Sequence, residues 1–343
     1  MTYRPLRILV PNFPAPDSFT DNVVHTLRAM GHEVRCMDRL GSRDRGRIGR
    51  ILHDAWMGYR PQTLTEQETW VLAQAQDWKP DLMIALTLSL RDEVLAELRA
   101  TGVTGLVAWW GDTPANMRGM GLLADGWDRI YIKDAAAVAK FCAVGLPADL
   151  MHEAMNPDWH QPLETSSHPD TGSVVVAGSY YGYRQIMIDR LEACNIPLAL
   201  YGPRPPRWSR PSVQAGHRGK YIVKDEKSHA FHAGLACLNS TALSEGNSLN
   251  CRAFEICGAG GLQLIENKSA VADCFDPGHE VLTYRSVDEI CAYLDRARKD
   301  PDWARSIREA GLARARAHHT YRHRLNRILS DLDMAPAQGS PTT

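Results

Sequence analysis

The chain has 343 residues, of which 44% are hydrophobic and 23% are charged, and its formal net charge is -1. This length and hydrophobic content allow a sizeable buried core and favour two domains over one. The near-neutral charge gives no overall attraction to nucleic acid or to anionic membranes, and no uninterrupted apolar stretch is long enough to span a bilayer.

The N-terminus shows no hydrophobic region of a signal peptide, and the eight cysteines form no Cys-x-x-Cys pair. We therefore expect a cytoplasmic protein with buried free thiols, without a disulfide framework or a zinc site. Asp-x-Asp sequences at 300–302 and 331–333 fall in or between predicted helices, where capping and solvation explain them. No metal site is predicted.

In the first half, short apolar runs alternate with amphipathic stretches, a pattern typical of strands alternating with helices. Strands are predicted at 7–10, 32–37, 82–88, 105–110, 129–133 and 149–153, and helices at 21–30, 91–100 and 135–144. Such alternation predicts right-handed crossovers and a parallel sheet covered by helices on both faces.

Around residues 156–171 the hydrophobic pattern stops, and this stretch is interpreted as a linker. Strands are then predicted at 173–177, 197–201, 236–238, 262–266 and 281–284, and helices at 183–194, 249–257 and 287–332. The predicted domains are 1–155 and 172–333, with a disordered tail at 334–343. The predicted fold class is α/β, with two Rossmann-like domains facing a cleft where ligands bind outside the carboxyl ends of the strands.

A set of short motifs in the second half occurs in a characteristic order. They are Asn-Cys-Arg-Ala-Phe-Glu-Ile-Cys-Gly-Ala-Gly-Gly at 250–261, Asp-Cys-Phe at 273–275, Gly-His-Glu at 278–280, Ser-Val-Asp-Glu-Ile at 286–290 and His-Thr-Tyr-Arg-His-Arg at 319–324. With them, the segment resembles the C-terminal domain of bacterial spore-maturation (CgeB-like) glycosyltransferases. The resemblance implies the GT-B architecture, with a nucleotide-sugar donor held mainly by the C-terminal domain.

Glu255 and Arg252 lie one helical turn apart within an Arg-x-x-Glu sequence. The resemblance places at Glu255 a carboxylate that accepts hydrogen bonds from the donor ribose; a first-turn acid favoured by the helix dipole is the alternative. Arg252 suits a pyrophosphate through paired hydrogen bonds, with help from helix-start amides at Leu249 and Asn250. An ion pair between Arg252 and Glu255 is the alternative.

Gly178 and Ser179 follow the first strand of the second domain, and Arg184 lies at the start of the next helix. A small residue after this strand lets backbone amides approach a phosphate, so the three residues are candidates for contacting the donor diphosphate. The stretch lacks the full Gly-x-Gly-x-x-Gly fingerprint of dinucleotide binding, which argues against a dehydrogenase.

Tyr201 and Gly202 end the next strand and, with an edge at 220–223, are candidates for binding the donor base; an ordinary strand end before a Pro-rich loop is the alternative. A polar loop with Glu245 and Asn247 precedes the Arg-x-x-Glu helix. Retaining glycosyltransferases of related architecture place an acid at the position of Asn247, where it meets the donor sugar. The amide here leaves retention or inversion open.

Asp112 follows the strand at 105–110 and is the candidate general base for an acceptor hydroxyl. A turn or capping residue before Pro114 is the alternative. Asn12 and Asp17, which follow the first strand, are rival candidates for contacts with the acceptor.

Two basic stretches are less specific. Residues 35–60 concentrate arginines and suit a phosphate-bearing acceptor, a membrane surface or nucleic acid, although a solvated basic loop is the simpler interpretation. The run with His318, His319 and His323 lies among arginines and is interpreted as a charged helix face.

These features predict a bacterial hexosyltransferase that moves a sugar from a nucleoside-diphosphate sugar, with a UDP-sugar as first choice, to an acceptor hydroxyl. No metal and no cofactor besides the nucleotide sugar are expected, and Asp112 would be the base if the enzyme inverts. The alternatives are a nucleic-acid-modifying glycosyltransferase that uses 35–60, a sugar-nucleotide epimerase of the same architecture, and a non-catalytic nucleotide- or nucleic-acid-binding module. A nucleic-acid partner is not favoured.

Overall fold

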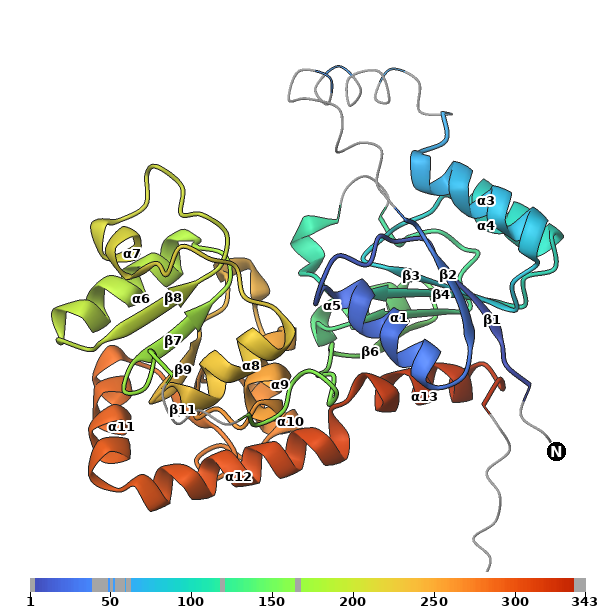
Figure 1. Cartoon of the computed structure of the whole chain (residues 1–343). Coiled ribbons are helices and arrows are strands. Elements are labelled where there is room, and N and C mark those ends of the chain that lie inside the picture. The colour runs from blue at the N-terminus through green and yellow to red at the C-terminus, as the bar shows by residue number, and fades with distance from the viewer. Residues whose placement is uncertain are drawn as a thin grey trace, which may run out of the picture. The chain divides into compact units, whose positions relative to one another are not determined.

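The chain forms two parallel α/β units (Figure 1). The computed structural model describes residues 4–38, 49, 52, 59, 63–117, 121–163 and 168–335. Contacts divide the chain into an N-terminal unit, Met1–Met151 with Leu325–Thr343, and a C-terminal unit, His152–Arg324. The two predicted sheets are confirmed, and the predicted cleft between them stays a prediction.

The N-terminal unit contains a parallel sheet with the order β2-β1-β3-β4-β5-β6. Its strands are β1 (Arg7–Val10), β2 (Glu33–Cys36), β3 (Leu82–Leu86), β4 (Gly105–Trp110), β5 (Arg129–Ile132) and β6 (Ala148–Leu150). Its helices are α1 (Phe19–Ala29), α3 (Glu66–Trp78), α4 (Asp92–Ala100), α5 (Ala135–Ala143) and most of α13 (Tyr321–Asp331), with a 3-10 turn at Pro114–Asn116.

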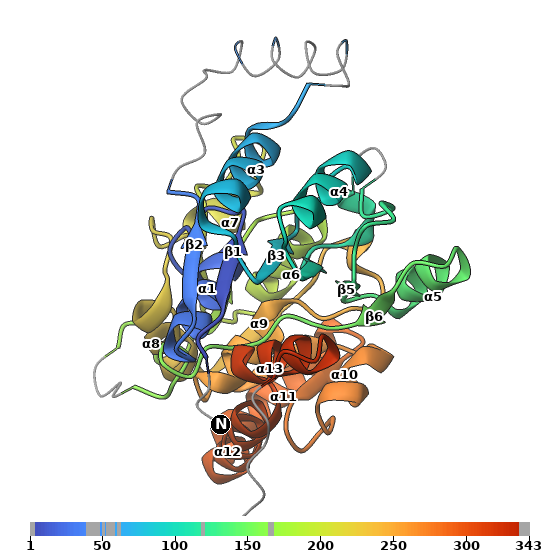
Figure 2. The same ribbon diagram turned by 90° about the vertical axis from the view of Figure 1, so that its right-hand side faces the viewer.

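Side chains alternate between the two faces of this sheet. Leu9, Met83 and Ala108 belong to a core with side chains of α3, α4 and α5. At other strand positions the side chains contact different helices. The ring of Trp109 packs edge-on against Phe19 of α1, with the ring centroids 4.8 Å apart. The hydroxyl of Tyr131 donates to a carboxylate oxygen of Asp331 of α13 at 2.7 Å. Figures 1 and 2 show that α3 and α4 lie beside a different part of this sheet from α1 and α13. Parallel strands buried on both faces explain their nearly unbroken apolar sequences.

The C-terminal unit contains the sheet β11-β10-β9-β7-β8. Its strands are β7 (Val174–Ala177), β8 (Leu198–Tyr201), β9 (Ala236–Asn239), β10 (Gln263–Glu266) and β11 (Leu282–Tyr284). Its helices are α6 (Gly182–Ala193), α7 (Pro211–Gly216), α8 (Lys224–Ala233), α9 (Cys251–Gly258), α10 (Ser269–Cys274), α11 (Val287–Lys299) and α12 (Pro301–His318), with a 3-10 turn at Leu243–Glu245.

A short segment continues the C-terminal sheet beyond β8. His217 forms a parallel bridge with Leu200, the amide of Arg218 donates to Leu200 O, and the amide of Gly202 donates to Lys220 O. Counted as a strand, this segment completes the 3-2-1-4-5-6 order of dinucleotide-binding sheets. The predicted edge at 220–223 therefore lies about three residues earlier in the chain.

Alternate residues of β7 enter two different cores. Val174 and Val176 pack with the side chains of α6 and α11. Val175 and Ala177 pack with side chains of α8 and α9, including Phe231. The sheet is thus covered on both faces, which holds the carboxyl ends of its strands in fixed positions.

The end of the described chain differs from the predicted boundary of the second domain, because residues 325–335 group with the N-terminal unit. Arg327 donates to Leu150 O at 2.9 Å and pairs with Asp149. Arg327 also pairs with Asp331 at 3.5 Å within the helix. These polar contacts, with the bond from Tyr131, attach α13 to β5 and β6.

The prediction of buried thiols is only partly correct. All eight cysteines are free, and Cys237, Cys257 and Cys274 are buried, whereas Cys142 and Cys194 are exposed. The exposed pair lies near helix C-termini, where apolar periodicity weakens. Within the described residues, no helix combines the length and the apolar character needed to cross a membrane.

His319 is not part of a charged helix face, as predicted, but lies in the core. It is 7% exposed, packs between Phe254 and Phe275, and bonds Cys274 O through Nε2 at 2.8 Å. Arg324 contacts its Nδ1 at 3.1 Å. Burial lowers the pKa of His319 to about 3.

This pKa makes stability depend on pH. An unfolded histidine has a pKa of about 6.5, so between pH 6.5 and 3 the unfolded chain binds a proton at His319 that the folded chain does not. Stability is therefore complete above pH 6.5 and falls below it, by about 1.4 kcal/mol per pH unit from this residue. We expect the melting temperature of His319→Gln to fall less steeply than that of the wild type between pH 6.5 and 5, as measured by circular dichroism. Parallel curves would contradict this.

Candidate functional site

The C-terminal sheet changes the direction in which strands are added between β7 and β9. The chain adds β8 on one side of β7 and then returns to place β9 on the other side. In parallel α/β sheets, ligands bind beside such a switch point, outside the carboxyl ends of the strands. The two loops at this point follow Ala177 and Asn239, and the first of them carries the predicted residues Gly178 and Ser179.

Two guanidinium groups meet at Gly178. Its φ of +123° is one that side-chain-bearing residues rarely adopt. A Cβ atom added there would lie 2.7 Å from Nη2 of Arg252 and 3.0 Å from Nη1 of Arg184. The structure thus brings Arg252 of the Arg-x-x-Glu sequence to Gly178 and Arg184 of the earlier segment, and glycine is needed for this close approach.

Arg184 is buried and held by oxygen atoms of the surrounding loops. Nη1 donates to Ser179 O at 2.7 Å, Nε donates to Ser240 Oγ at 3.0 Å, and Nη2 donates to Ser240 O. The guanidinium also lies 4.5 Å from the centre of the Tyr181 ring. Burial first, and the positive charge of Arg252 second, lower the pKa of Arg184 to about 10. Arg184 therefore stays charged at neutral pH beside a second cation, an arrangement that favours an anion.

Arg252 lies in the first turn of α9. Its Nε is buried and has no hydrogen-bond partner among the residues that the structure describes. Within that same part of the chain, the predicted alternative, an ion pair with Glu255, is not formed. A buried donor without a partner is costly, and a bound oxyanion would satisfy it.

Glu255 pairs with a lysine that the sequence did not single out. Its Oε1 lies 2.9 Å from Nζ of Lys227 and 3.8 Å from Nε2 of His160. Glu255 and Lys227 are 3% and 8% exposed. Lys227 lies on α8, which the hydrophobic pattern did not predict, so no sequence signal placed it here. The pair holds the Glu255 carboxylate in a defined position one turn after Arg252.

The amides at the start of α9 are largely occupied. The side chain of Asn250 caps the helix by accepting from Ala253 N at 3.2 Å. Glu153, which the sequence placed in a strand, accepts from Cys251 N at 3.2 Å. Asn250 also exchanges hydrogen bonds with Asn239. The side chain of Asn250 is thus a structural cap, and the guanidinium groups, rather than these amides, offer free donors for a phosphate.

Tyr201 and Gly202 have different structural roles. The Tyr201 hydroxyl donates to Asp170 at 2.5 Å, and its ring is buried in the core with α8 and α9. This contact supports the alternative interpretation of Tyr201 as an ordinary strand end. Gly202 has φ +144°, and a Cβ atom there would overlap Gly178 O. The backbones at the ends of β7 and β8 therefore touch.

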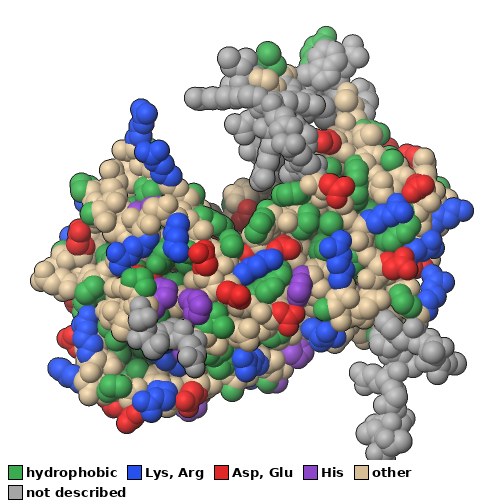
Figure 3. Space-filling model, in the orientation of Figure 1, with side chains coloured by type: hydrophobic (Ala, Val, Ile, Leu, Met, Phe, Trp, Pro, Cys, Tyr) green, Lys and Arg blue, Asp and Glu red, His purple; other side chains and the backbone are tan. Residues whose placement is uncertain are grey.

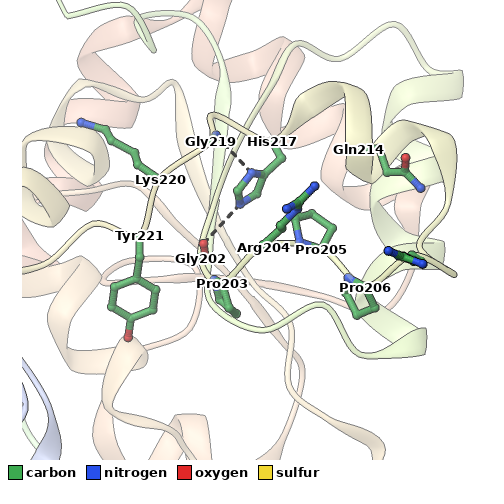
Figure 4. Close-up of a pocket in the computed structure, with 11 residues that line it drawn as sticks. Gly202, Pro203, Arg204, Pro205, Pro206, Gln214, His217, Gly219, Lys220 and Tyr221 are labelled. Atoms are coloured by element: carbon green, nitrogen blue, oxygen red, sulfur yellow. Dashed lines mark hydrogen bonds between the residues drawn. The ribbon is translucent and has the colours of Figure 1, made fainter.

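A cavity of about 800 Å³ adjoins Gly202 (Figure 4). The residues that line it are Gly202, Pro203, Arg204, Pro205, Pro206, Arg207, Gln214, His217, Gly219, Lys220 and Tyr221. Its volume lies in the range of small-molecule sites. Because Gly202 touches Gly178, this cavity is next to the two guanidinium groups.

Asn247 and Glu245 are bound within the protein. The Asn247 amide donates to Ser269 Oγ at 2.7 Å and accepts from Ala270 N at 3.0 Å, so it caps α10. Glu245 accepts from Ser248 Oγ at 2.8 Å. These contacts fix the loop before α9 and account for Asn247 without a donor sugar.

The acceptor-side candidates lie at carboxyl ends of the N-terminal sheet. Asn12 exchanges two hydrogen bonds with the backbone of Leu86 and so joins the ends of β1 and β3. Asp17 has φ +57°, and its amide donates to Asp21. The carboxylate of Asp112 accepts from Thr113 N and from the Asn116 side chain, both at 2.7 Å. These bonds favour the turn interpretation of Asp112, and its catalytic role stays a prediction.

Most of the basic stretch 35–60 lies outside the described residues. Arg35 is described, and it pairs with Asp77 and Gln74 at 2.9 Å and lies over the Trp78 ring. These contacts with α3 give Arg35 a structural role.

Comparisons with known proteins connect this geometry with an activity. Residues 184–330 match the model of a family described as glycosyl transferase-like. The chain has the GT-B fold. The matched segment starts at Arg184 and includes Arg252 and Glu255, so it contains most of the arrangement described above. No curated protein sequence matches the chain.

Solved structures resemble nearly the whole chain. Sucrose-phosphate synthase from Thermosynechococcus elongatus is 13% identical, with a TM-score of 0.64 over 96% of this chain and 99% of its own. Anabaena Alr3699/HepE in complex with UDP and glucose is 12% identical, with a TM-score of 0.61 over 95% and 99%. A glycosyltransferase from Rickettsia africae is 9% identical, with a TM-score of 0.62 over 96% and 99%. At these identities the likeness shows the fold.

Proposed function

We propose that this protein is a glycosyltransferase of the CgeB-like type that moves a sugar from a nucleoside-diphosphate sugar, UDP-sugar being the first choice, to an acceptor hydroxyl. The observation that carries the proposal is the approach of Arg184 and Arg252 to Gly178 at the switch point of the C-terminal sheet. Neither arginine forms an ion pair with a carboxylate in the part of the chain that the structure describes. A diphosphate would neutralise both charges.

The chemistry follows from the charges at this point. As the bond to the sugar breaks, negative charge develops on the diphosphate leaving group. Preorganised guanidinium groups stabilise that charge without needing a metal ion. Arg184 is held by Ser179 and Ser240, so little reorganisation is needed during the reaction. Asp112 is the proposed base for the acceptor hydroxyl if the enzyme inverts.

The choice of a ribonucleotide is assigned to Glu255. A carboxylate held by Lys227 can accept hydrogen bonds from both ribose hydroxyls. UDP is proposed because a protein of the same fold, Alr3699/HepE, has been solved in complex with UDP and glucose. The base is proposed to lie beside Gly202, at the edge formed by 217–220.

Glu255→Gln is the variant that tests this proposal. We expect the wild type to bind UDP more tightly than 2′-deoxy-UDP in calorimetry, and Glu255→Gln to lose that preference, because an amide accepts fewer hydrogen bonds from the ribose. Breaking the buried pair should also cost about 3 kcal/mol of stability, since Lys227 loses a partner.

The double variant Glu255→Gln with Lys227→Met is the matched control, because it removes both charges of the pair. It should regain part of the lost stability but not the preference for UDP. A variant that still discriminates between the two nucleotides would place the ribose elsewhere. If the protein converted a UDP-sugar to its epimer in the absence of any acceptor, the proposed activity would be epimerisation instead of transfer.

A further inference from the structure

Two cysteines of the C-terminal unit lie in contact although they are far apart in the chain. Cys194 is the C-cap residue of α6, and Cys291 lies in the second turn of α11. The thiol of Cys291 forms a hydrogen bond with the thiol of Cys194. Both cysteines are free, so the two sulfur atoms meet without being bonded to each other.

The packing of the two helices holds these thiols together. Helices α6 and α11 contact each other, and they contribute Leu191, Ile290 and Leu294 to one buried core. Leu191 lies one turn before Cys194, and Ile290 is the neighbour of Cys291, which itself packs against this core. The contact between the sulfur atoms is therefore set by the core of the unit and persists as long as the two helices stay packed.

The two thiols differ in their access to solvent. Cys194 is exposed, whereas Cys291 is partly buried. Basic and acidic side chains are interspersed over the face of the C-terminal unit that Figure 3 shows. Because the two signs are mixed, a negatively charged reagent such as glutathione disulfide meets no strong field of its own sign on this face. Cys194 is therefore the thiol that such a reagent reaches first.

Protonation assigns the same order to the two thiols. Burial first, then the contact with Cys194 and the carboxylates of Asp288 and Asp295, raise the pKa of Cys291 to about 11. Cys291 is therefore protonated at neutral pH, and a thiol is a much weaker nucleophile than a thiolate. It can react efficiently only with a sulfur atom that is already beside it, which is the sulfur of Cys194.

We propose that Cys194 and Cys291 form a redox-active pair, which closes to a disulfide when a small-molecule disulfide such as glutathione disulfide is the oxidant. The thiolate of Cys194 attacks one sulfur of glutathione disulfide, breaks its S–S bond and releases one glutathione. The sulfur of Cys291, losing its proton, then attacks the Cys194 sulfur and releases the second glutathione. The two cysteines are oxidised by two electrons, and one glutathione disulfide is reduced to two glutathione thiols, which take up the two protons.

The disulfide stabilises the C-terminal unit. It joins the end of α6 to α11 and closes a loop of about 100 residues. A cross-link that closes so long a loop restricts the unfolded chain much more than the folded one. Neither cysteine is among the residues that line the cavity beside Gly202, so the bond acts on the stability of the unit and leaves that cavity unchanged.

The test compares the full chain after incubation with glutathione disulfide and after incubation with dithiothreitol. Peptide mapping by mass spectrometry should recover Cys194 linked to Cys291 from the oxidised protein. Its melting temperature, followed by circular dichroism, should lie about 5–10 °C above that of the reduced protein. Cys142→Ser is the matched control and should keep this shift, because Cys142 is also exposed but belongs to the N-terminal unit, where its thiol bonds Ala148 O.

The two single variants should stop the reaction at different points. Cys291→Ser should accumulate the mixed disulfide between Cys194 and glutathione, whereas Cys194→Ser should leave Cys291 reduced, and both should lose the shift in melting temperature. Oxidised wild type in which Cys194 carries glutathione while Cys291 stays reduced would overturn the proposal. A mapped bond between Cys194 residues of two chains would also overturn it, and an unchanged melting temperature with the bond in place would refute its stabilising effect.

Discussion

Arg252→Gln is expected to weaken the binding of UDP by about 10- to 100-fold. Hydrogen bonds to charged groups contribute about 1.5–3 kcal/mol, and a tenfold change in affinity corresponds to about 1.4 kcal/mol. The melting temperature of the free protein should hardly change, because the Arg252 guanidinium makes no hydrogen bond in the described structure and repels Arg184. Calorimetric titration and thermal unfolding measure the two quantities.

Arg184→Gln is the informative comparison. Arg184 bonds Ser179 and Ser240, so its loss leaves two buried carbonyl groups with fewer partners and should lower the melting temperature by several degrees. The two variants thus distinguish Arg252, which we expect to contribute to ligand binding alone, from Arg184, which also stabilises the surrounding loops. If Arg252→Gln bound UDP with wild-type affinity, the diphosphate would not bind beside Gly178, and the proposed donor site would be wrong.

Gly202→Ala is expected to destabilise the protein by about 3 kcal/mol or more. The φ of +144° is strained for alanine, which contributes about 1–3 kcal/mol. In addition, the new Cβ would overlap Gly178 O, a backbone atom that cannot rotate away. Urea denaturation measures the change, and UDP binding should weaken as well because Gly178 must move.

Gly172→Ala provides the control for the strain alone. Gly172 has φ +85° in the same unit, and an added Cβ would meet nothing within 4 Å. Its cost should therefore be about 1–2 kcal/mol, from the backbone conformation only. Equal losses at Gly172 and Gly202 would mean that the contact between the ends of β7 and β8 adds nothing to stability.

Local signals in the sequence explain which elements were predictable. Buried strands such as β4 (Gly105–Trp110) were predicted with their bounds, because continuous apolar runs differ clearly from their surroundings. Helix α3 was not predicted, since its apolar face is weak, yet Thr65 and Glu68 form a capping box that announces its start. That signal was present in the sequence and was missed.

The candidate site residues also differ in whether a local signal in the sequence could identify them. Gly178, Arg184 and Arg252 could be proposed from strand ends and helix starts, because these positions follow from local pattern and from the topology of parallel sheets. Lys227, which holds Glu255, could not be proposed, because the two residues are joined only when α8 packs beside α9. Glu153 at the start of α9 is a second case, since its partner Cys251 is far away in the chain.

The amino-acid sequence alone determined the α/β class, the two parallel sheets and the loops that carry the donor-site candidates, because hydrophobic periodicity and turn residues act over short distances. Tertiary structure decided which charges are paired. Tyr201 became a core residue through Asp170, and His319 left the predicted charged face for the core. Among the residues that the structure describes, Arg204 and Arg207 form no ion pair. Pairing and burial depend on residues brought together from distant segments, and no local pattern specifies them.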